Sequence, residues 1–415
     1  MNRAPSPHGE WVDPADADDL PEDLRGKRAY VPRPLKSDLF LPTETHAVLA
    51  MAEHTLGELN ESTRRLPHRT MFALCTRLRE VQNSAQLAGM SVDFSETWLT
   101  RLLLARAADD VEQQNLVLDR HPIGRVILAF EHGAARVADG AVVDGDLLWQ
   151  VAGKLTGTTG GSVETSLRAH QSVLRSRSPE QPAILTTPPG GLLRSAFAQW
   201  STWVGAPHPL SRIGRISLAH LNLVLLDPFP GTGDYLTSVH SSLAMVGTGL
   251  LRDQVLPLSS WLDEQAVEYY RRVGAVMDGG PIEDWIRFFA LGVRSAGKAQ
   301  LALIGELDAL SKELLDQVDG SPTVQKVVAG LMTAPVTNNR TLEVMYGMAN
   351  RTATQVTRQL VKAGVLEVVG GKSYNKVFVC QPVLDVYALQ TPRAPASDRD
   401  VFAPSASGPA HRRDD

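Results

Sequence analysis

The spacing of apolar residues predicts a mainly α-helical chain. Apolar side chains recur every three or four residues in most segments between residues 36 and 320, which is the period of one helix face. Pro42 and Thr43 precede the first such run, which carries Val48, Ala52 and Leu56, and they supply a helix start. Further helices are predicted at residues 69–87, 95–114, 145–156, 190–204, 209–226, 236–255, 259–276 and 281–318. A short strand is predicted at residues 183–187, where two prolines stop it.

The pattern changes after residue 320. Three short helical runs are followed by VLEVV at residues 365–369, by Gly370 and Gly371, and by alternating apolar residues at 374–379. Two glycines supply the positive φ values that a tight hairpin needs. The segment is predicted to be a winged helix-turn-helix.

Charge and cysteine content narrow the function classes. The chain has 415 residues with 41 Lys and Arg against 46 Asp and Glu, a net charge of −5, which argues against a surface that binds nucleic acid all over. Two distant cysteines, Cys75 and Cys380, favour neither a disulfide framework nor a thiolate metal site. No signal peptide or membrane-spanning stretch is recognisable, so a cytoplasmic protein without membrane association is expected.

A glycine-containing loop at residues 226–236, reading LDPFPGTGDYL, joins two predicted helices. Free backbone N–H groups and the positive dipole end at a helix start attract phosphate, and glycines let a ligand approach the backbone. The loop is therefore a candidate phosphate site, although such connections between helices are common.

This loop resembles the signature of the Fic family, His-Pro-Phe-x-Asp-Gly-Asn-Gly-Arg-x-x-Arg between two helices. The resemblance extends over about residues 36–388 and implies a helical bundle with a small β flap. Members with the full motif typically transfer AMP from ATP to a hydroxyl group on a target protein. Flanking segments that also resemble the family are Thr187-Pro188-Pro189, His208-Pro209-Leu210, Ala219-His220, Leu256-Pro257-Leu258-Ser259, Glu268-Tyr269-Tyr270 and residues 284–289.

Carried onto this chain, the family's chemistry is largely absent. In the family the His accepts the hydroxyl proton, the Asp holds a metal, and the Asn and Arg grip phosphates. Asp227 stands at the His position, and a carboxylate with an ordinary pKa of about 3.9 is a weak base for an alcohol. A one-residue deletion removes the metal-holding Asp, so Thr232 matches the Asn, Asp234 the first Arg and Thr237 the second. A carboxylate in place of a guanidinium repels a triphosphate, so binding of ATP and Mg²⁺ is predicted to be weak and AMP transfer to be lost.

The residues that give the loop its shape remain. Phe229 is expected to anchor the loop in the core, and the glycines permit its turns. Asp227 is the catalytic candidate, and the nucleotide-binding candidates are Gly231, Thr232, Gly233, Asp234 and Thr237.

Nearby groups offer alternatives. His220 lies two helical turns before Asp227 and His240 one turn beyond Leu236, but a buried helix histidine with one hydrogen bond is the commoner role. Asp227 and Asp234 carry oxygens suited to a divalent cation, yet loop carboxylates are more often solvated, so no metal site is predicted.

The resemblance also implies an inhibitory helix. Many family members carry Ser/Thr-x-x-x-Glu, whose Glu blocks a phosphate-gripping Arg. Glu112 is the counterpart here, with Ala108 in place of the hydroxyl residue.

The C-terminal segment is basic, whereas the rest of the chain is acidic. Residues 321–388 hold seven basic and three acidic residues, a net charge of +4, on a chain with a net charge of −5. Phosphate neutralisation supplies most non-specific affinity for DNA, so this segment is the expected DNA contact. Residues 350–364 are predicted to be its recognition helix, capped by Asn350 and ended by Gly364. The DNA-binding candidates are Arg351, Thr352, Thr354, Gln355, Arg358, Lys372 and Lys376.

Three functions remain open from sequence. The first is a Fic-like protein with a degraded catalytic loop that acts as a regulatory protein binding DNA or a target protein. The second is a Fic-type transferase that keeps nucleotide or phosphate-ester binding through the glycine loop, and the third is a scaffold or homodimerisation protein. The expected organisation is a disordered arm (1–35), an N-terminal helical region (36–120), a Fic-like domain (121–318) with its degenerate loop (227–237), a winged helix-turn-helix (319–388) and a disordered tail (389–415).

Overall fold

The computed structural model describes residues 6–66, 68–158, 160–175, 183–318, 321–369 and 376–389. Seventeen α-helices and seven short strands lie in these residues, so the prediction of a mainly α fold is confirmed. The helices are α1 (Thr43–Arg64), α2 (Arg69–Leu87), α3 (Phe94–Arg106), α4 (Val111–Arg120), α5 (Ile123–Ala138), α6 (Gly145–Thr156), α7 (Val163–Ser166), α8 (Gly191–Gly205), α9 (Arg212–Leu226), α10 (Gly233–Gly247), α11 (Leu258–Glu264), α12 (Ala266–Met277), α13 (Ile282–Asp316), α14 (Pro322–Leu331), α15 (Asn339–Tyr346), α16 (Asn350–Lys362) and α17 (Gln381–Leu389). The strands are β1 (Gly9–Val12), β2 (Ala29–Pro32), β3 (Val173–Leu174), β4 (Ile184–Leu185), β5 (Val336–Asn338), β6 (Glu367–Val369) and β7 (Val377–Val379).

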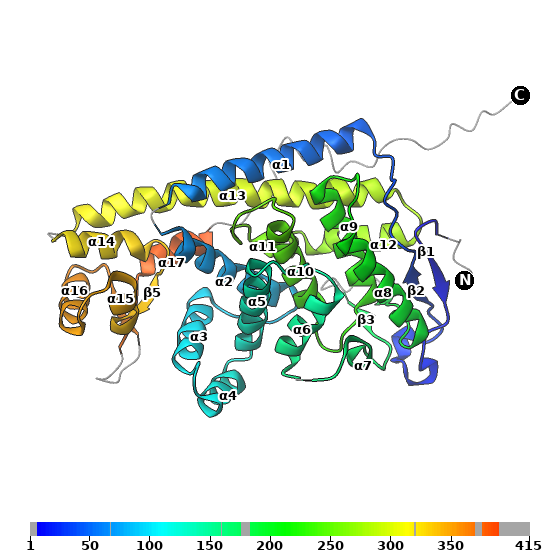
Figure 1. Ribbon diagram of the computed structural model, residues 1–415, viewed down its shortest axis with the longest axis horizontal. Helices are drawn as coiled ribbons and strands as arrows, with labels where there is room; N and C mark the ends of the chain where they lie inside the picture. Colours follow the sequence, from blue (N-terminus) through cyan, green and yellow to red (C-terminus); the bar gives the residue numbers. More distant parts are fainter. Residues whose placement is uncertain are drawn as a thin grey trace, which may run out of the picture.

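Helix α13 is 35 residues long and contacts α1, α9, α11, α12, α14 and α17. Helix α1 packs along it, and the N-terminal strands and the C-terminal helices α14 to α17 lie toward opposite ends of this pair (Figure 1). Among the described residues, no helix combines the length and apolarity that a membrane crossing requires.

Helix α9 lies in the core and carries the glycine loop at its C-terminal end. Every residue from Ile216 to Leu226 is buried, because this helix is apolar around most of its circumference. It contacts α1, α8, α10, α13 and β2, while α10 also contacts α2, α5 and α6. The loop is therefore held between two helices that are themselves fixed on all sides.

The prediction of a disordered arm at residues 1–35 is wrong for its described part, residues 6–35. Strands β1 and β2 form an antiparallel pair, and β2 pairs in parallel with β4 through Ala29 and Leu185, giving a sheet of order β1-β2-β4-β3. Tyr30 is fully buried, with the Trp11 ring packed edge-on 5.0 Å from it. The few large apolar residues of this segment are buried against the rest of the protein. This burial offsets the entropy cost of ordering the segment, which local composition alone does not reveal.

Two predicted helices are each split in the structure. The run at 95–114 ends at Arg106 and restarts as α4, because the Asp110 carboxylate accepts a hydrogen bond 3.0 Å from the Gln113 N–H and caps a new helix. The run at 259–276 breaks at Gln265 between α11 and α12.

Helix α5 was missed by the sequence reasoning. Its signal is present, since Ile123, Val126, Ile127 and Phe130 follow a helical period after Pro122 and are all buried. It packs against α6, α2 and α10 and forms part of the core.

The C-terminal segment contains three helices before a pair of antiparallel strands near the expected hairpin residues, and a fourth helix, α17, follows the strands. Its chain order is α14, β5, α15, α16, β6, β7, and β7 lies between β5 and β6 in an antiparallel sheet. Gly370 and Gly371, the predicted hairpin turn, and residues 390–415 of the predicted tail lie outside the described residues.

Candidate functional site

The glycine loop has the shape that its apolar and small residues predict. Asp227 leaves α9 with φ of 41°, a left-handed conformation that Asp tolerates better than most side chains. Phe229 is 1% exposed and meets the Phe197 ring edge-on at 5.3 Å. Gly231 and Gly233 take φ values of 69° and 38°, where a side chain would be strained. Phe229 thus anchors the loop, and the glycines turn it into α10.

Arg168, in the segment between α7 and β3, holds the start of this loop. Its guanidinium donates to the backbone carbonyls of Asp227 at 2.7 Å and Leu226 at 3.1 Å, and also to Thr187 O. These carbonyls include the free C-terminal end of α9, where a cation also interacts favourably with the helix dipole. Burial lowers the pKa of Arg168 to about 10, although the neighbouring Asp227 opposes that shift. Sequence reasoning missed Arg168, since an arginine in a loop carries no sign that it will be buried.

The Asp227 carboxyl group is partly buried and accepts a hydrogen bond from the Ser172 hydroxyl. Burial raises the pKa of this carboxyl, while the Ser172 hydrogen bond and the nearby Arg168 charge work in the opposite direction. The Asp227 side chain, which matches the family's catalytic His position, is therefore hydrogen-bonded to the residue that precedes β3.

The other polar candidates of the loop are also engaged within the protein. Thr232 is fully buried and its hydroxyl donates to Phe229 O at 3.0 Å, while the Thr237 hydroxyl donates to Asp234 O at 2.9 Å. Asp234 lies in the first turn of α10 and accepts a hydrogen bond from the Tyr270 hydroxyl at 3.0 Å. An acidic side chain at a helix N-terminus stabilises the helix and opposes a phosphate group there. These residues do not fit the triphosphate that the family resemblance implies.

Two buried histidines lie behind the loop. His220 hydrogen-bonds Ser241 Oγ at 2.8 Å through Nδ1 and Tyr269 OH at 2.9 Å through Nε2, so it makes two hydrogen bonds and not one. Burial lowers the pKa of His220 to about 3 and that of His240 to about 4, so both are neutral at physiological pH.

The remaining sequence candidates are Glu112 and a metal site. Glu112 is exposed in the first turn of α4, a helix that contacts α3 and α5. Within the part of the chain that the structure describes, no group of three or more His, Cys, Asp or Glu side chains could hold a metal ion.

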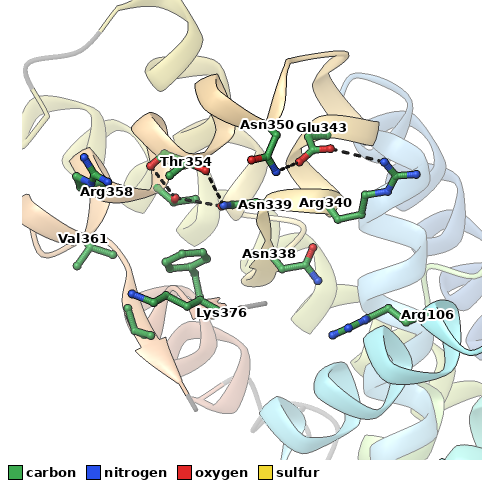
Figure 2. A pocket seen from close by; sticks show the side chains of 13 residues that line it. Arg106, Asn338, Asn339, Arg340, Glu343, Asn350, Thr354, Arg358, Val361 and Lys376 are labelled. Atoms are coloured by element: carbon green, nitrogen blue, oxygen red, sulfur yellow. Dashed lines mark hydrogen bonds and ion pairs between the residues drawn. The ribbon is translucent and has the colours of Figure 1, made fainter. Parts of the chain in front are cut away.

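A second site lies on the C-terminal segment, where a groove of about 690 Å³ runs between α15, α16 and the hairpin (Figure 2). The groove is lined by the basic residues Arg340, Arg358 and Lys376. Among the described residues that line it, Glu343 is the one acidic residue. Arg340 pairs with Glu343 at 3.6 Å and stays 81% exposed, so the pairing leaves the guanidinium accessible.

The groove is stiffened by side chains that join α15 to α16. Asn339 donates to Thr354 Oγ1 at 3.0 Å and accepts from the Thr357 hydroxyl at 3.1 Å, and Asn338 caps α15 by accepting from Thr341 N at 2.8 Å. Thr354 is one of the predicted DNA-binding candidates, but its side chain is half-buried and hydrogen-bonded to Asn339.

The remaining recognition-helix candidates differ in position. Arg351, Thr352, Gln355 and Arg358 are exposed on α16, and Arg358 lines the groove. Asn350 was predicted to cap the helix, but Ala349 takes the cap position and the Asn350 amide donates to Glu343. Lys372 lies outside the described residues.

Arg106 was missed by the sequence reasoning. It ends α3, more than 200 residues before the hairpin in the chain, and it lines the same groove from the opposite side (Figure 2). Only the packing of α3 beside β5 brings it there. Four cations from separate elements therefore line one groove.

Comparison with known proteins identifies neighbours in structure. No family model matches the chain, and no curated protein matches it. The chain is similar to the crystal structure of a Fic family protein from Desulfovibrio desulfuricans G20, with a TM-score of 0.49 and 13% identity over 83% of this chain and 98% of that one. It is also similar to Fic-1 from C. elegans, with a TM-score of 0.43 and 14% identity over 63% of this chain and 74% of that one. These structural neighbours are Fic family proteins.

Proposed function

We propose that this chain is a DNA-binding regulatory protein whose C-terminal winged helix contacts duplex DNA and whose glycine loop does not transfer AMP. The observation that carries the proposal is that one groove is lined by four cations, Arg106, Arg340, Arg358 and Lys376. Lys and Arg side chains that meet on one face are the electrostatic footprint of a nucleic-acid site.

The order of elements supports the same reading. Helix α16 follows α15 as a recognition helix follows its partner, and the β6–β7 hairpin flanks it as a wing would. Arg351, Thr352 and Gln355 are exposed on α16 and available for bases or phosphates. The Asn339 hydrogen bonds hold α16 in a fixed orientation, which reduces the ordering cost of binding.

The loss of AMP transfer is supported by the state of the loop. Asp227 is bound to Ser172, and Thr232 and Thr237 direct their hydroxyl groups to backbone carbonyls. Asp234 brings negative charge to the helix end where a phosphate would lie. We therefore expect no label to appear in any protein when the purified chain is incubated with α-³²P ATP, Mg²⁺ and a cell extract, and incorporation dependent on the chain would refute this half of the proposal.

Fluorescence anisotropy with a labelled duplex of about 20 base pairs tests the DNA half. Arg358→Ala removes one groove cation, and Lys298→Ala removes one exposed cation on α13, outside the groove. We expect Arg358→Ala to weaken binding by about 3- to 30-fold and Lys298→Ala by less than 2-fold, since one phosphate contact is lost in the first case. Equal effects of the two variants would contradict a DNA site in the groove, and no binding to any duplex would favour a scaffold that binds protein.

A further inference from the structure

A second cavity, of about 560 Å³, lies away from both sites described above. It is lined by Val137 near the end of α5, by residues 140–143 between α5 and α6, by the C-terminal end of α8, by the first half of α9 and by the second half of α10. The glycine loop joins the opposite ends of α9 and α10, so this cavity is separate from it. Its volume is in the range of small-molecule sites.

The cavity wall combines apolar side chains with positive charge. Arg212 and Arg215 line it, and none of the described lining residues is acidic. Val142 lines the cavity although it is 56% exposed, which places an apolar surface where the cavity meets solvent. The apolar part of the wall includes Val137, Val142, Val143, Val204, Ile216 and Ala244.

Three nitrogen atoms of residues that line this cavity are buried without a hydrogen-bond partner in the described structure. They are Trp203 Nε1, Arg215 Nε and His240 Nδ1, and Trp203 and His240 are only 8% and 2% exposed. The indole and guanidinium groups can only donate, and a neutral imidazole can donate from Nδ1 in one tautomer. Each unsatisfied buried group costs about 1–3 kcal/mol, so three around one cavity call for an acceptor.

The position of Arg215 is fixed by the chain itself. Its Nη2 donates to Val204 O and Ala206 O, each at 3.2 Å, and these hydrogen bonds hold the guanidinium at the end of α8. The Nε atom is buried without a hydrogen-bond partner in the described structure. Burial lowers the pKa of Arg215 and the nearby charge of Arg212 lowers it further. A bound anion would relieve both effects.

We propose that this cavity binds a small amphipathic carboxylic acid, with its hydrocarbon part against the valine and isoleucine side chains and its carboxylate accepting hydrogen bonds from Arg215 and Trp203. The ligand class follows from the wall, because a purely apolar compound would leave the nitrogens unpaired and a small inorganic anion would leave the apolar wall unfilled. The residues that carry the buried nitrogens line the cavity, so the proposal requires the wall to open at these nitrogens when the carboxylate binds.

Titration of the full chain with decanoate and with 1-decanol tests the proposal. The two probes share a hydrocarbon chain and differ in the charge of the head group. Binding is followed by isothermal titration calorimetry and by the indole N–H signals of ¹⁵N-tryptophan-labelled protein, among which Trp203→Phe identifies the Trp203 signal. We expect decanoate to bind at least 10-fold more tightly than decanol and to shift the Trp203 signal.

Two variants and one control complete the test. Arg215→Met keeps an unbranched side chain up to the Nε position and removes the guanidinium charge, and we expect it to weaken decanoate binding by about 10- to 100-fold while decanol changes less than 2-fold. Arg194→Met, an exposed change on α8, should leave both affinities unchanged. If Arg215→Met does not fold, Trp203→Phe serves in its place, with an expected loss of about 3- to 10-fold for decanoate.

The possible results separate clearly. Preference for decanoate that depends on Arg215 or Trp203 supports the proposal. Equal binding of decanoate and decanol, no binding of either, or decanoate binding that both variants leave unchanged overturns it.

Discussion

Arg168 offers the sharpest test of how the glycine loop is held. In Arg168→Met the side chain keeps its approximate length and loses the guanidinium that binds the carbonyls of Leu226, Asp227 and Thr187. Arg168 is 6% exposed, so water has little access to replace the lost donors. At about 1–3 kcal/mol for each buried acceptor left without a donor, and with part of the cost of burying the cation recovered, the expected loss of unfolding free energy is about 3–5 kcal/mol.

Urea-induced unfolding of the full chain, followed by circular dichroism and tryptophan fluorescence, measures this loss. Arg168→Lys keeps a positive charge, but all the N–H donors of the lysine side chain lie on one nitrogen atom. We therefore expect this variant to retain about half of the unfolding free energy that Arg168→Met loses. Arg194→Met, on the exposed face of α8, should change stability by less than about 0.5 kcal/mol. A loss below about 1 kcal/mol for Arg168→Met would refute the claim that this arginine holds the segment between α7 and β3 to the end of α9.

Three further predictions concern other parts of the molecule. Burial raises the pKa of Glu80 to about 7 despite hydrogen bonds from the Ser259 N–H and hydroxyl, so the folded state prefers the protonated acid and stability from this group is lost as pH rises from about 4.5 through 7. Between pH 5 and pH 8, the unfolding free energy of Glu80→Gln should therefore fall by about 2.5 kcal/mol less than that of the original chain, and parallel pH profiles would contradict this. Asn339→Ala removes the two hydrogen bonds that Asn339 makes to α16 and should cost about 1–2 kcal/mol in urea unfolding and weaken DNA binding. Unchanged stability would show that the packing of α15 on α16 does not depend on Asn339. Arg106→Ala should weaken DNA binding as much as Arg358→Ala does, and an effect no larger than that of Lys298→Ala would remove α3 from the interface.

Helices with strong local signals were predictable from sequence. Helices α2 and α6 have the predicted bounds, residues 69–87 and 145–156, because their apolar period is regular and α6 has a capping residue. Asp144 accepts hydrogen bonds from two N–H groups in the first turn of α6, and Gly157 ends the helix with a positive φ. Where start and stop signals are local, the pattern alone is sufficient.

Features that depend on distant partners were not predictable in this way. Strands β1 and β2 are four residues each and gain their stability from β4 and from the burial of Tyr30, which local composition does not reveal. The roles of Arg168 and Arg106 likewise arise from packing between segments far apart in the chain. Of the loop, sequence predicted the anchoring Phe229 and the glycine turns, which are set by local sterics, but not the side chains that occupy its polar groups.

The salt dependence of binding to duplex DNA tests the proposed function most directly. Four groove cations that each displace a counterion give a slope of about −3 to −4 for the logarithm of the association constant against the logarithm of salt concentration, and Arg358→Ala should reduce its magnitude by about 1. Affinity that stays constant between about 50 and 200 mM salt would contradict a phosphate-binding groove in this protein.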